Sequence, residues 1–210
     1  ALRRPDTAAA APPPAAEQEV ELPFPEPEPV QVELSPDLLY SLLVGEVGAQ
    51  RNDLEKALGH YLYVAKTSAL PYAAERAARI ARFIDDDERA REASELWVRL
   101  APNDMAARRF AAARYLADEE PGKAMEELDA LIRIAGARGE KGFLEAAEVL
   151  SAAPDKAEGL ELMRRLVETR DGDPEARYAL MVTALANQRF AEARDNARRV
   201  LAERPEWHHR

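Results

Sequence analysis

The chain has 210 residues and a net charge of −10 at pH 7, and 47% of its residues are hydrophobic but only 6% aromatic. The absence of cysteine excludes disulfides, thiolate nucleophiles and cysteine zinc sites, and the acidic balance argues against nucleic acid, whose phosphates need a basic face. No run of residues approaches the roughly 18 apolar positions of a membrane-spanning helix, and an alanine-rich composition with few aromatics favours packed helices over a β-sandwich.

The first predicted element, residues 1–34, is a leader rich in proline, alanine and glutamate. Nine of the 15 prolines precede residue 37, and residues 1–37 carry two arginines against eight acidic residues, a charge of −6. Proline and repeated glutamate favour an extended chain, and the few apolar residues do not offset the entropy of ordering it. We predict a disordered acidic tether; the alternative is a tail with no function.

From residue 35 onward one unit recurs along the chain. A small residue returns at positions 57, 90, 124, 159 and 193, each time in an amphipathic segment such as DLEKALGHY at 53–61. A second small position precedes this marker in the first four units, as Gly45 does in the first. Small side chains let two helix backbones approach where they cross, and large apolar residues fill the space around them. The structural markers of the repeat are Gly45, Ala57, Ala90, Ala124, Gly159 and Ala193.

These markers divide residues 35–205 into five predicted helical hairpins. Ser35 is expected to be the N-cap of the first, and Pro174 to open the last from the first helical position. Residues 206–210 are expected to begin a further repeat or to be a truncated end. The predicted hairpins span residues 36–66, 71–100, 104–134, 140–169 and 174–203.

Paired helices that recur with a period of about 34 residues resemble the tetratricopeptide-repeat family, here over residues 36–205. The resemblance implies an all-α fold, a right-handed superhelical solenoid of about five hairpins preceded by a disordered Pro/Ala/Glu-rich leader. In such a solenoid the first helix of each hairpin lines an inner groove. Gly159 departs from the pattern, because it replaces the alanine of the other units.

No cluster of residues in the sequence has the spacing of a catalytic or metal site. The histidines, His60, His208 and His209, are not spaced as ligands along one helix, and there is no glycine-rich phosphate loop. The acidic runs at 85–88 and 118–120 are interpreted as helix starts, where carboxylates favour the positive end of the helix dipole, rather than as cation sites. We therefore predict no catalytic residue, no metal and no cofactor.

The resemblance also predicts a protein-binding groove on the first helices. Three arginines at such positions, Arg79, Arg82 and Arg109, are placed to converge on a carboxylate of an acidic ligand. The alternative is that they pair with Glu75 and nearby acids. The predicted groove residues are Tyr72, Glu75, Arg79, Arg82, Arg109, Leu116, Lys141, Leu144, Tyr178, Val182 and Leu185.

The acidic leader and the segment LSPDLLYSLLVGEVGAQRNDLEKALGHYLYVAKTSALPYAAERAARIARFIDD carry a narrower resemblance. Together they are similar to the amino-terminal part of bacterial outer-membrane tetratricopeptide-repeat lipoproteins that bind a periplasmic carboxyl-terminal-processing protease. The resemblance implies a non-catalytic adaptor on the periplasmic side of the outer membrane that helps to deliver substrates such as cell-wall hydrolases. Its only membrane contact would be a lipidated cysteine preceding Ala1, and the chain is expected to continue past residue 210.

Two alternatives to the adaptor stay open. One is a generic interaction module in envelope assembly or secretion, or in the cytoplasm. The other is the regulatory repeat region of a longer enzyme. Protein partners are expected in all three cases, and nucleic acid in none.

Overall fold

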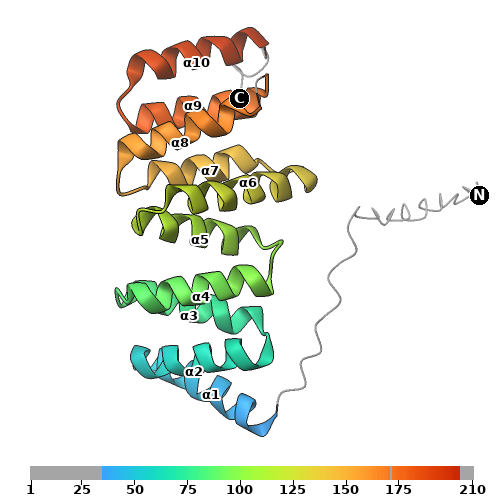
Figure 1. The fold of residues 1–210 in the computed structure, drawn as a ribbon, viewed down its shortest axis with the longest axis vertical. Helices are drawn as coiled ribbons and strands as arrows, with labels where there is room; N and C mark the ends of the chain where they lie inside the picture. The colour runs from blue at the N-terminus through green and yellow to red at the C-terminus, as the bar shows by residue number, and fades with distance from the viewer. Residues whose placement is uncertain (1–34, 171, 204–210) are drawn as a thin grey trace, which may run out of the picture. The chain divides into compact units, whose positions relative to one another are not determined.

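A computed structural model describes residues 35–170 and 172–203. Within these residues the structure contains ten α-helices and no strand (Figure 1), and none of those helices is both long and apolar enough to cross a bilayer. The predicted leader, residues 1–34, and the predicted further repeat at 206–210 lie outside the described residues. The helices are α1 (Pro36–Gln50), α2 (Leu54–Ser68), α3 (Pro71–Phe83), α4 (Asp87–Leu100), α5 (Met105–Ala117), α6 (Pro121–Ala137), α7 (Gly142–Ser151), α8 (Lys156–Glu168), α9 (Pro174–Ala186) and α10 (Phe190–Glu203).

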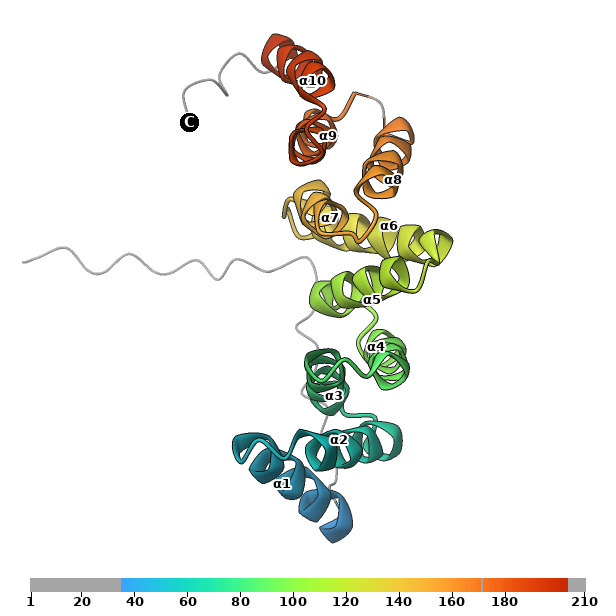
Figure 2. The same ribbon diagram turned by 90° about the vertical axis from the view of Figure 1, so that its left-hand side faces the viewer.

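The helices pair and stack in chain order. Each helix packs against the next, and α7 also packs against α5 and α9, the first helices of the neighbouring pairs. Figure 2 shows α3, α7 and α9 along one side of the stack and α4, α6 and α8 along the other. The predicted all-α fold of about five hairpins is confirmed, because five consecutive helix pairs occupy residues 36–203.

The third pair departs most from the predicted bounds, since α6 extends to Ala137 instead of ending near residue 134. The additional turn buries Ala135, which is 0% exposed. The helix ends in a Schellman motif, in which the Glu140 N–H donates to the Ala135 carbonyl at 2.9 Å and Gly139 adopts a φ of 71°. Glycine takes this left-handed conformation without steric cost, so Gly139 sets where α6 stops.

Two predicted helix starts rest on specific side chains. Ser35 Oγ accepts the Leu38 N–H at 3.3 Å, which confirms Ser35 as an N-cap, and α9 starts on its predicted proline. In the acidic run at 85–88, Asp86 Oδ1 accepts the Arg89 N–H at 2.9 Å. The run therefore starts α4, as interpreted, and the described residues hold no group of three His, Cys, Asp or Glu able to bind a metal ion.

The core consists of two clusters of buried side chains that meet in α5. The first cluster runs from Leu38 to Phe110 and the second from Ala111 to Ala193. The half-buried Val98 of α4 packs against both clusters. The two clusters therefore adjoin within α5, and this helix contributes buried side chains to both of them.

The small residues that mark the repeat lie inside this core. An ideal Cβ on Gly45 would meet the ring of Tyr61 in α2 at 3.2 Å, and one on Gly159 would meet the Leu150 carbonyl oxygen at 2.3 Å. These contacts show how closely neighbouring helices approach at the marker positions. All six markers are buried: Gly45, Ala57, Ala90, Ala124, Gly159 and Ala193.

Four of the five hairpins turn through a residue that is not glycine yet has a left-handed backbone. These residues are Asn52, Asp85, Glu119 and Gln188, with φ between 56° and 61°. In each turn the N–H of the following residue donates to a helix carbonyl five positions earlier, at 2.8 or 2.9 Å. This is the Schellman geometry that glycine favours, so each side chain here costs backbone free energy.

Replacing Glu119 with glycine is expected to raise the free energy of unfolding by about 0.5–1 kcal/mol. Relief of the left-handed strain outweighs the greater freedom that glycine gives the unfolded chain. Glu119 is exposed and has no ion pair with a described residue, so little is lost with its side chain. Urea unfolding followed by far-UV circular dichroism measures the change. Glu119→Ala is the control, because alanine removes the carboxylate but keeps the strain; equal stability of the two variants would contradict the prediction.

Candidate functional site

The helix α3 carries three arginines on successive turns, Arg76, Arg79 and Arg82, which we call the arginine row. The segment ERAARIARF places small or aliphatic residues between them, and Ala77, Ala78 and Ala81 are completely buried. The alanines therefore pack α3 into the core and hold the three guanidinium groups at the surface of the same helix.

Each guanidinium of the arginine row lies over an aromatic ring. Arg76 Cζ is 5.7 Å from the centroid of Tyr61 in α2. Arg79 Cζ is 5.7 Å from the centroid of Trp97 in α4, and Arg82 Cζ is 5.0 Å from that of Phe110 in α5. Such contacts attract a cation to the negative face of the ring without neutralising its charge. Three helices thus supply one ring each to hold one arginine of α3.

The acids around the row are unevenly distributed. Arg79 Nε donates to Glu75 Oε1 at 2.8 Å, and Arg76 Nη2 lies 3.8 Å from Glu46 Oε2. Arg82 has no carboxylate within ion-pair distance among the described residues. Of the three arginines, Arg82 therefore has the positive charge that is least compensated by nearby acids.

The end of the row beside α1 is fixed by a small polar cluster. The Tyr72 hydroxyl donates to Glu46 Oε1 at 2.6 Å, and Arg76 Nε donates to the Tyr61 hydroxyl at 3.5 Å. Burial opposes ionisation of Glu46, but hydrogen bonds from Tyr72 and Tyr61 and the charge of Arg76 outweigh it, so the pKa of Glu46 is lowered. Burial raises the pKa of Tyr61 to about 12, which keeps its hydroxyl protonated.

A pocket of about 310 Å³ lies beside the row, between the turn that joins α1 to α2 and the second half of α3. Its walls combine two guanidinium groups with apolar side chains, and Phe83 is 75% exposed at its edge. A guanidinium beside an apolar wall suits a carboxylate that follows or precedes an apolar side chain. The lining residues are Ala49, Asn52, Leu54, Arg76, Arg79, Ile80 and Phe83.

The convergence of Arg79, Arg82 and Arg109 on one carboxylate stays a prediction, but the structure gives Arg109 acidic partners of its own. Arg109 Nη1 lies 2.8 Å from Glu145 Oε2 and 3.6 Å from Glu148 Oε2, both on α7. Its acids are supplied by the next helix pair, so it shares no partner with the two arginines of α3. The alternative of pairing with nearby acids describes Arg79 and Arg109, whereas Arg82 pairs with a ring.

The other predicted groove residues divide by exposure. Leu116 is only 4% exposed and belongs to the second core cluster, so it presents no surface to a ligand. Leu116 lies in the last turn of α5, where this helix packs against α6. Its position in the repeat alone does not indicate that it is buried. Leu144 and Val182 are half-buried. Lys141 and Leu185 are exposed, and Tyr178 is 36% exposed.

Comparisons with known proteins place this helix stack among repeat proteins. No family model matches the chain. A TPR repeat-containing protein of Pseudomonas aeruginosa is 37% identical over 130 residues, which are 60% of this chain and 21% of that protein. The match spans about a fifth of that relative. The crystal structure of a tetratricopeptide repeat protein from Parabacteroides merdae aligns with a TM-score of 0.50 at 14% identity, covering 80% of this chain and 65% of that one. The fold is that of a tetratricopeptide-repeat solenoid.

A second solved structure agrees with this assignment of the fold. The MamA protein aligns with a TM-score of 0.50 at 14% identity, over 80% of this chain and 92% of its own. In the tetratricopeptide-repeat solenoid, α1, α3, α5, α7 and α9 are the first helices of successive repeats. The arginine row thus lies on the first helix of the second repeat, and Arg109 on that of the third.

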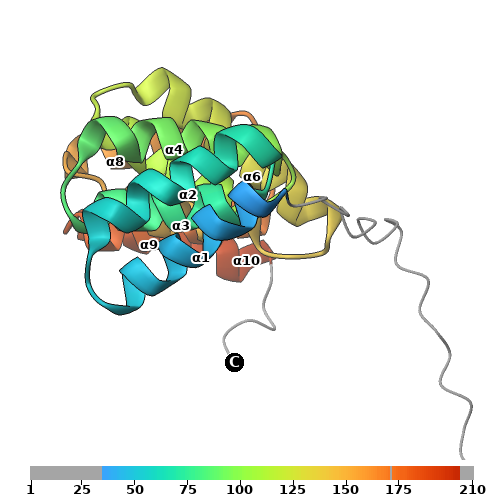
Figure 3. The same cartoon turned by 90° about the horizontal axis from the view of Figure 1, so that it is seen from below.

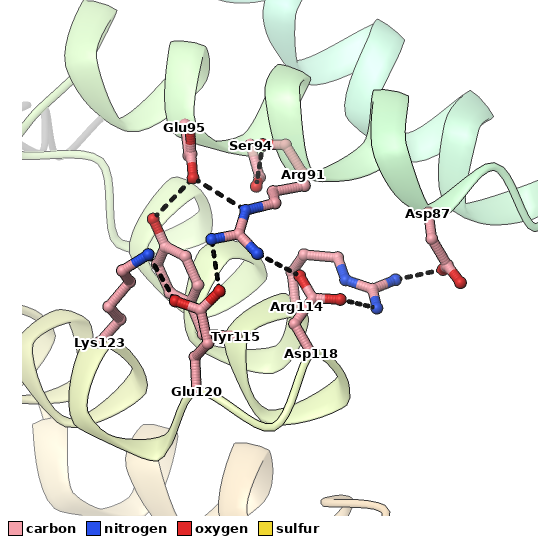
Figure 4. A network of polar contacts seen from close by, with 9 residues as sticks. All are labelled: Asp87, Arg91, Ser94, Glu95, Arg114, Tyr115, Asp118, Glu120 and Lys123. Atoms are coloured by element: carbon pink, nitrogen blue, oxygen red, sulfur yellow. Dashed lines mark hydrogen bonds and ion pairs between the residues drawn. The ribbon is translucent and has the colours of Figure 1, made fainter.

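A polar network joins the second and third repeats of the solenoid at α4, α5 and α6 (Figure 4). Arg91 Nη1 lies 3.5 Å from Asp118 Oδ2, and its Nη2 lies 2.5 Å from Glu120 Oε1. Arg114 Nη1 lies 2.5 Å from Asp87 Oδ1, and its Nη2 also pairs with Asp118. Each arginine therefore bridges α4 to the turn between α5 and α6.

The network revises the interpretation of the acidic run at 118–120. Glu120 precedes α6, as a helix-start residue does, but it makes no side-chain cap hydrogen bond. Instead, hydrogen bonds from Lys123 and Arg91 lower the pKa of its carboxyl group. The spacing of Arg114 and Asp118 by four residues was a visible signal for one pair. The contact of Arg91 with Asp118 joins residues 27 positions apart and follows only from the fold.

Proposed function

We propose that this solenoid is a non-catalytic protein-binding scaffold and that the arginine row with its pocket is a recognition site. The ligand is an extended peptide segment in which carboxylates alternate with apolar side chains. The observation that carries the proposal is Arg82, a cation held over the Phe110 ring with no acid beside it among the described residues. Arg79 lies on the preceding turn of the same helix, and it lines the pocket between α3 and the turn that joins α1 to α2.

Prior fixation of the arginines favours such binding. A free arginine side chain loses rotamer entropy when it grips a carboxylate, and a guanidinium already stacked on a ring has lost much of that freedom. Residues 71–83 carry three arginines and one glutamate, a charge of +2 within a chain whose net charge is −10. An acidic segment is therefore attracted to α3 against the overall charge of the protein.

The acids of α7 limit the extent of this site. Glu145 and Glu148 neutralise Arg109 and would repel carboxylates that continue along the first helices. The ligand segment is thus short, with its acidic part over α3. Apolar residues at Leu144, Val182 and Leu185 suit a more hydrophobic continuation of the same partner.

We also propose, from the resemblance of the leader and the first two repeats, that the partner is a periplasmic carboxyl-terminal-processing protease. The whole protein would then be an outer-membrane lipoprotein adaptor that brings cell-wall hydrolases to the protease. The second candidate is a generic interaction module in envelope assembly or secretion. It rests on the same groove and does not need the narrower resemblance. Co-purification of the full-length protein from envelope extract tests this choice. Recovery of such a protease supports the adaptor, and its absence from the recovered partners overturns it.

The recognition site itself is tested with a labelled peptide, ELEFEL, by fluorescence anisotropy. The double variant Arg79→Glu/Arg82→Glu is expected to weaken binding at least tenfold, and binding to the unaltered protein should weaken as salt is added, because both charges are exposed. The control Arg194→Glu/Arg198→Glu makes the same change of charge at two exposed arginines of α10.

A second variant distinguishes loss of the binding site from loss of the fold. Arg82→Met keeps an unbranched side chain over Phe110 but removes the charge, and it should weaken peptide binding several-fold with an unchanged circular dichroism spectrum. Equal affinity of the α3 double variant and the α10 control would rule out the arginine row as the site.

A further inference from the structure

The first helix of the solenoid is apolar on both sides. Its 15 residues, PDLLYSLLVGEVGAQ, include only two charged side chains, and its inner side is buried against α2. Its outer side carries the α1 stripe, which is Leu39, Tyr40, Leu43 and Val47, all between 42% and 65% exposed. A helix that is apolar all round is normally covered on both sides, and the end of a repeat array normally has a polar face. Figure 3 shows α1 and α2 at the near end of the stack.

The α1 stripe borders a hollow that accepts a side chain. A pocket of about 330 Å³ lies between the second half of α1 and the start of α2, with an apolar wall and a rim that carries both basic and acidic side chains. The apolar surface continues onto α2, where Tyr63 is 48% exposed and His60 meets the Tyr40 ring edge-on, with centroids 6.4 Å apart. The pocket is lined by Tyr40, Leu43, Val44, Val47, Gly48, Arg51, Asp53 and Lys56.

The two ends of α1 carry opposite charges, so two copies of this helix could pair in an antiparallel arrangement. Asp37 lies in the first turn, and Arg51 is the C-cap. Neither has an ion-pair partner among the described residues. If two α1 helices lie antiparallel with the midpoint between Leu43 and Val44, Asp37 of each copy comes opposite Gln50 of the other, one residue from Arg51. The same register brings Tyr40 of each copy to the pocket beside Val47 of the other.

We propose that the α1 stripe is an interface between two copies of this chain, related by a twofold axis that crosses α1 near Leu43. Residues 39, 43 and 47 form an i, i+4, i+8 ridge, the kind of ridge that packs into the groove of a facing helix. A twofold interface uses the same surface on both subunits, and α1 meets this requirement in its apolar ridge, its pocket and its end charges.

The size of the surface indicates a weak, reversible dimer. One helix and the edge of a second cover less than the roughly 800 Å² per partner of a standard interface, so association in the micromolar range is expected. Dimerisation covers the α1 stripe, whereas the arginine row meets α1 through Glu46, which is not part of that stripe, so Arg79 and Arg82 of both copies stay accessible. The dimer would thus present two arginine rows, and its existence does not depend on the proposed ligand.

Sedimentation velocity of the full chain between 1 and 200 µM tests the dimer. The weight-average mass should rise from 23.3 kDa toward twice that value. Leu43→Glu, which opposes two carboxylates at the twofold axis, should remain monomeric throughout the range. Leu201→Glu on α10 is the matched control, because Leu201 is 44% exposed and distant in the stack from α1, and it should associate like the unaltered protein.

Variants with exchanged charges distinguish pairing of two α1 helices from binding of another partner to α1. Asp37→Arg and Arg51→Asp should each weaken self-association at least tenfold, because like charges then face each other across the interface. An equimolar mixture of the two variants should associate within threefold of the unaltered protein, since each opposed pair again has opposite charges. A full chain that stays monomeric at 200 µM, or a mixture no tighter than the single variants, overturns the proposal.

Discussion

Trp97→Ala is expected to lower the free energy of unfolding by about 3–5 kcal/mol, the cost of removing a large aromatic side chain from a close-packed core. Trp97 is 1% exposed and lies where the second repeat meets the third, with its ring 6.0 Å from that of Phe110. Its Nε1–H donates to Asp104 Oδ2 at 3.1 Å, while Asp104 Oδ1 accepts the Ala106 N–H at 2.8 Å. The substitution thus leaves a cavity and also removes the partner that orients the N-cap of α5.

Urea unfolding followed by far-UV circular dichroism measures the effect of Trp97→Ala. Phe83→Ala is the control, because Phe83 is 75% exposed and its removal should change stability by less than about 0.5 kcal/mol. Trp97→Phe should fall between the two, since it keeps most of the ring volume but loses the hydrogen bond to Asp104. A loss below about 1 kcal/mol for Trp97→Ala would show that the contact between the two repeats does not depend on this side chain.

Gly159→Ala is expected to lower the free energy of unfolding by about 2–3 kcal/mol, although alanine is the residue that other repeats have at this position. A Cβ here would lie 2.3 Å from the Leu150 carbonyl oxygen and 3.3 Å from Ala153 Cβ. The first atom belongs to the backbone of α7, so no side-chain rotation relieves the clash and α8 must move away from α7. At Gly159, α8 therefore lies too close to the backbone of α7 to accommodate a Cβ.

The same substitution at Gly59 is the control, with the opposite expected sign. Gly59 is in the interior of α2, is exposed and has no atom within 4 Å of an added Cβ. Gly59→Ala should raise the free energy of unfolding by about 1 kcal/mol, because alanine is the better helix former. Thermal and urea unfolding of both variants give the comparison. Equal shifts at the two positions would contradict the close approach of α7 and α8.

The repeat and its helix pairs were predictable because they depend on periodic features. The markers at Ala57, Ala90 and Ala124 recur at an interval that is typical of paired helices, and a proline or a Ser N-cap marks several starts. The turns were less predictable. Residues such as Glu119 adopt a left-handed backbone that their type does not favour, and the requirement comes from the hydrogen bonds of the Schellman motif.

The candidate site was predictable only in part, because it depends on contacts between repeats. The arginines of α3 are visible in the sequence as an i, i+3, i+6 series, yet the predicted groove includes Arg79 and Arg82 without Arg76. The rings that hold the row come from three different helices, and no local pattern relates Arg82 of α3 to Phe110 of α5. Gly159 shows the same limit. In the sequence it is a departure from the alanine of the other repeats, whereas in the structure a backbone oxygen of α7 leaves no room for a Cβ at this position.

The division of the core at α5 has a consequence for how the molecule responds to stress. Phe110 completes one buried cluster and Ala111 opens the next, so neither half can lose α5 without exposing apolar surface of the other. In a repeat protein, stability is a sum of units and of their nearest-neighbour interfaces, and a helix that belongs to both halves makes them unfold together. Because α5 belongs to both halves, it couples their unfolding. A ligand that binds at α3 and stabilises the first half would therefore also raise the free energy of unfolding of the repeats after α5.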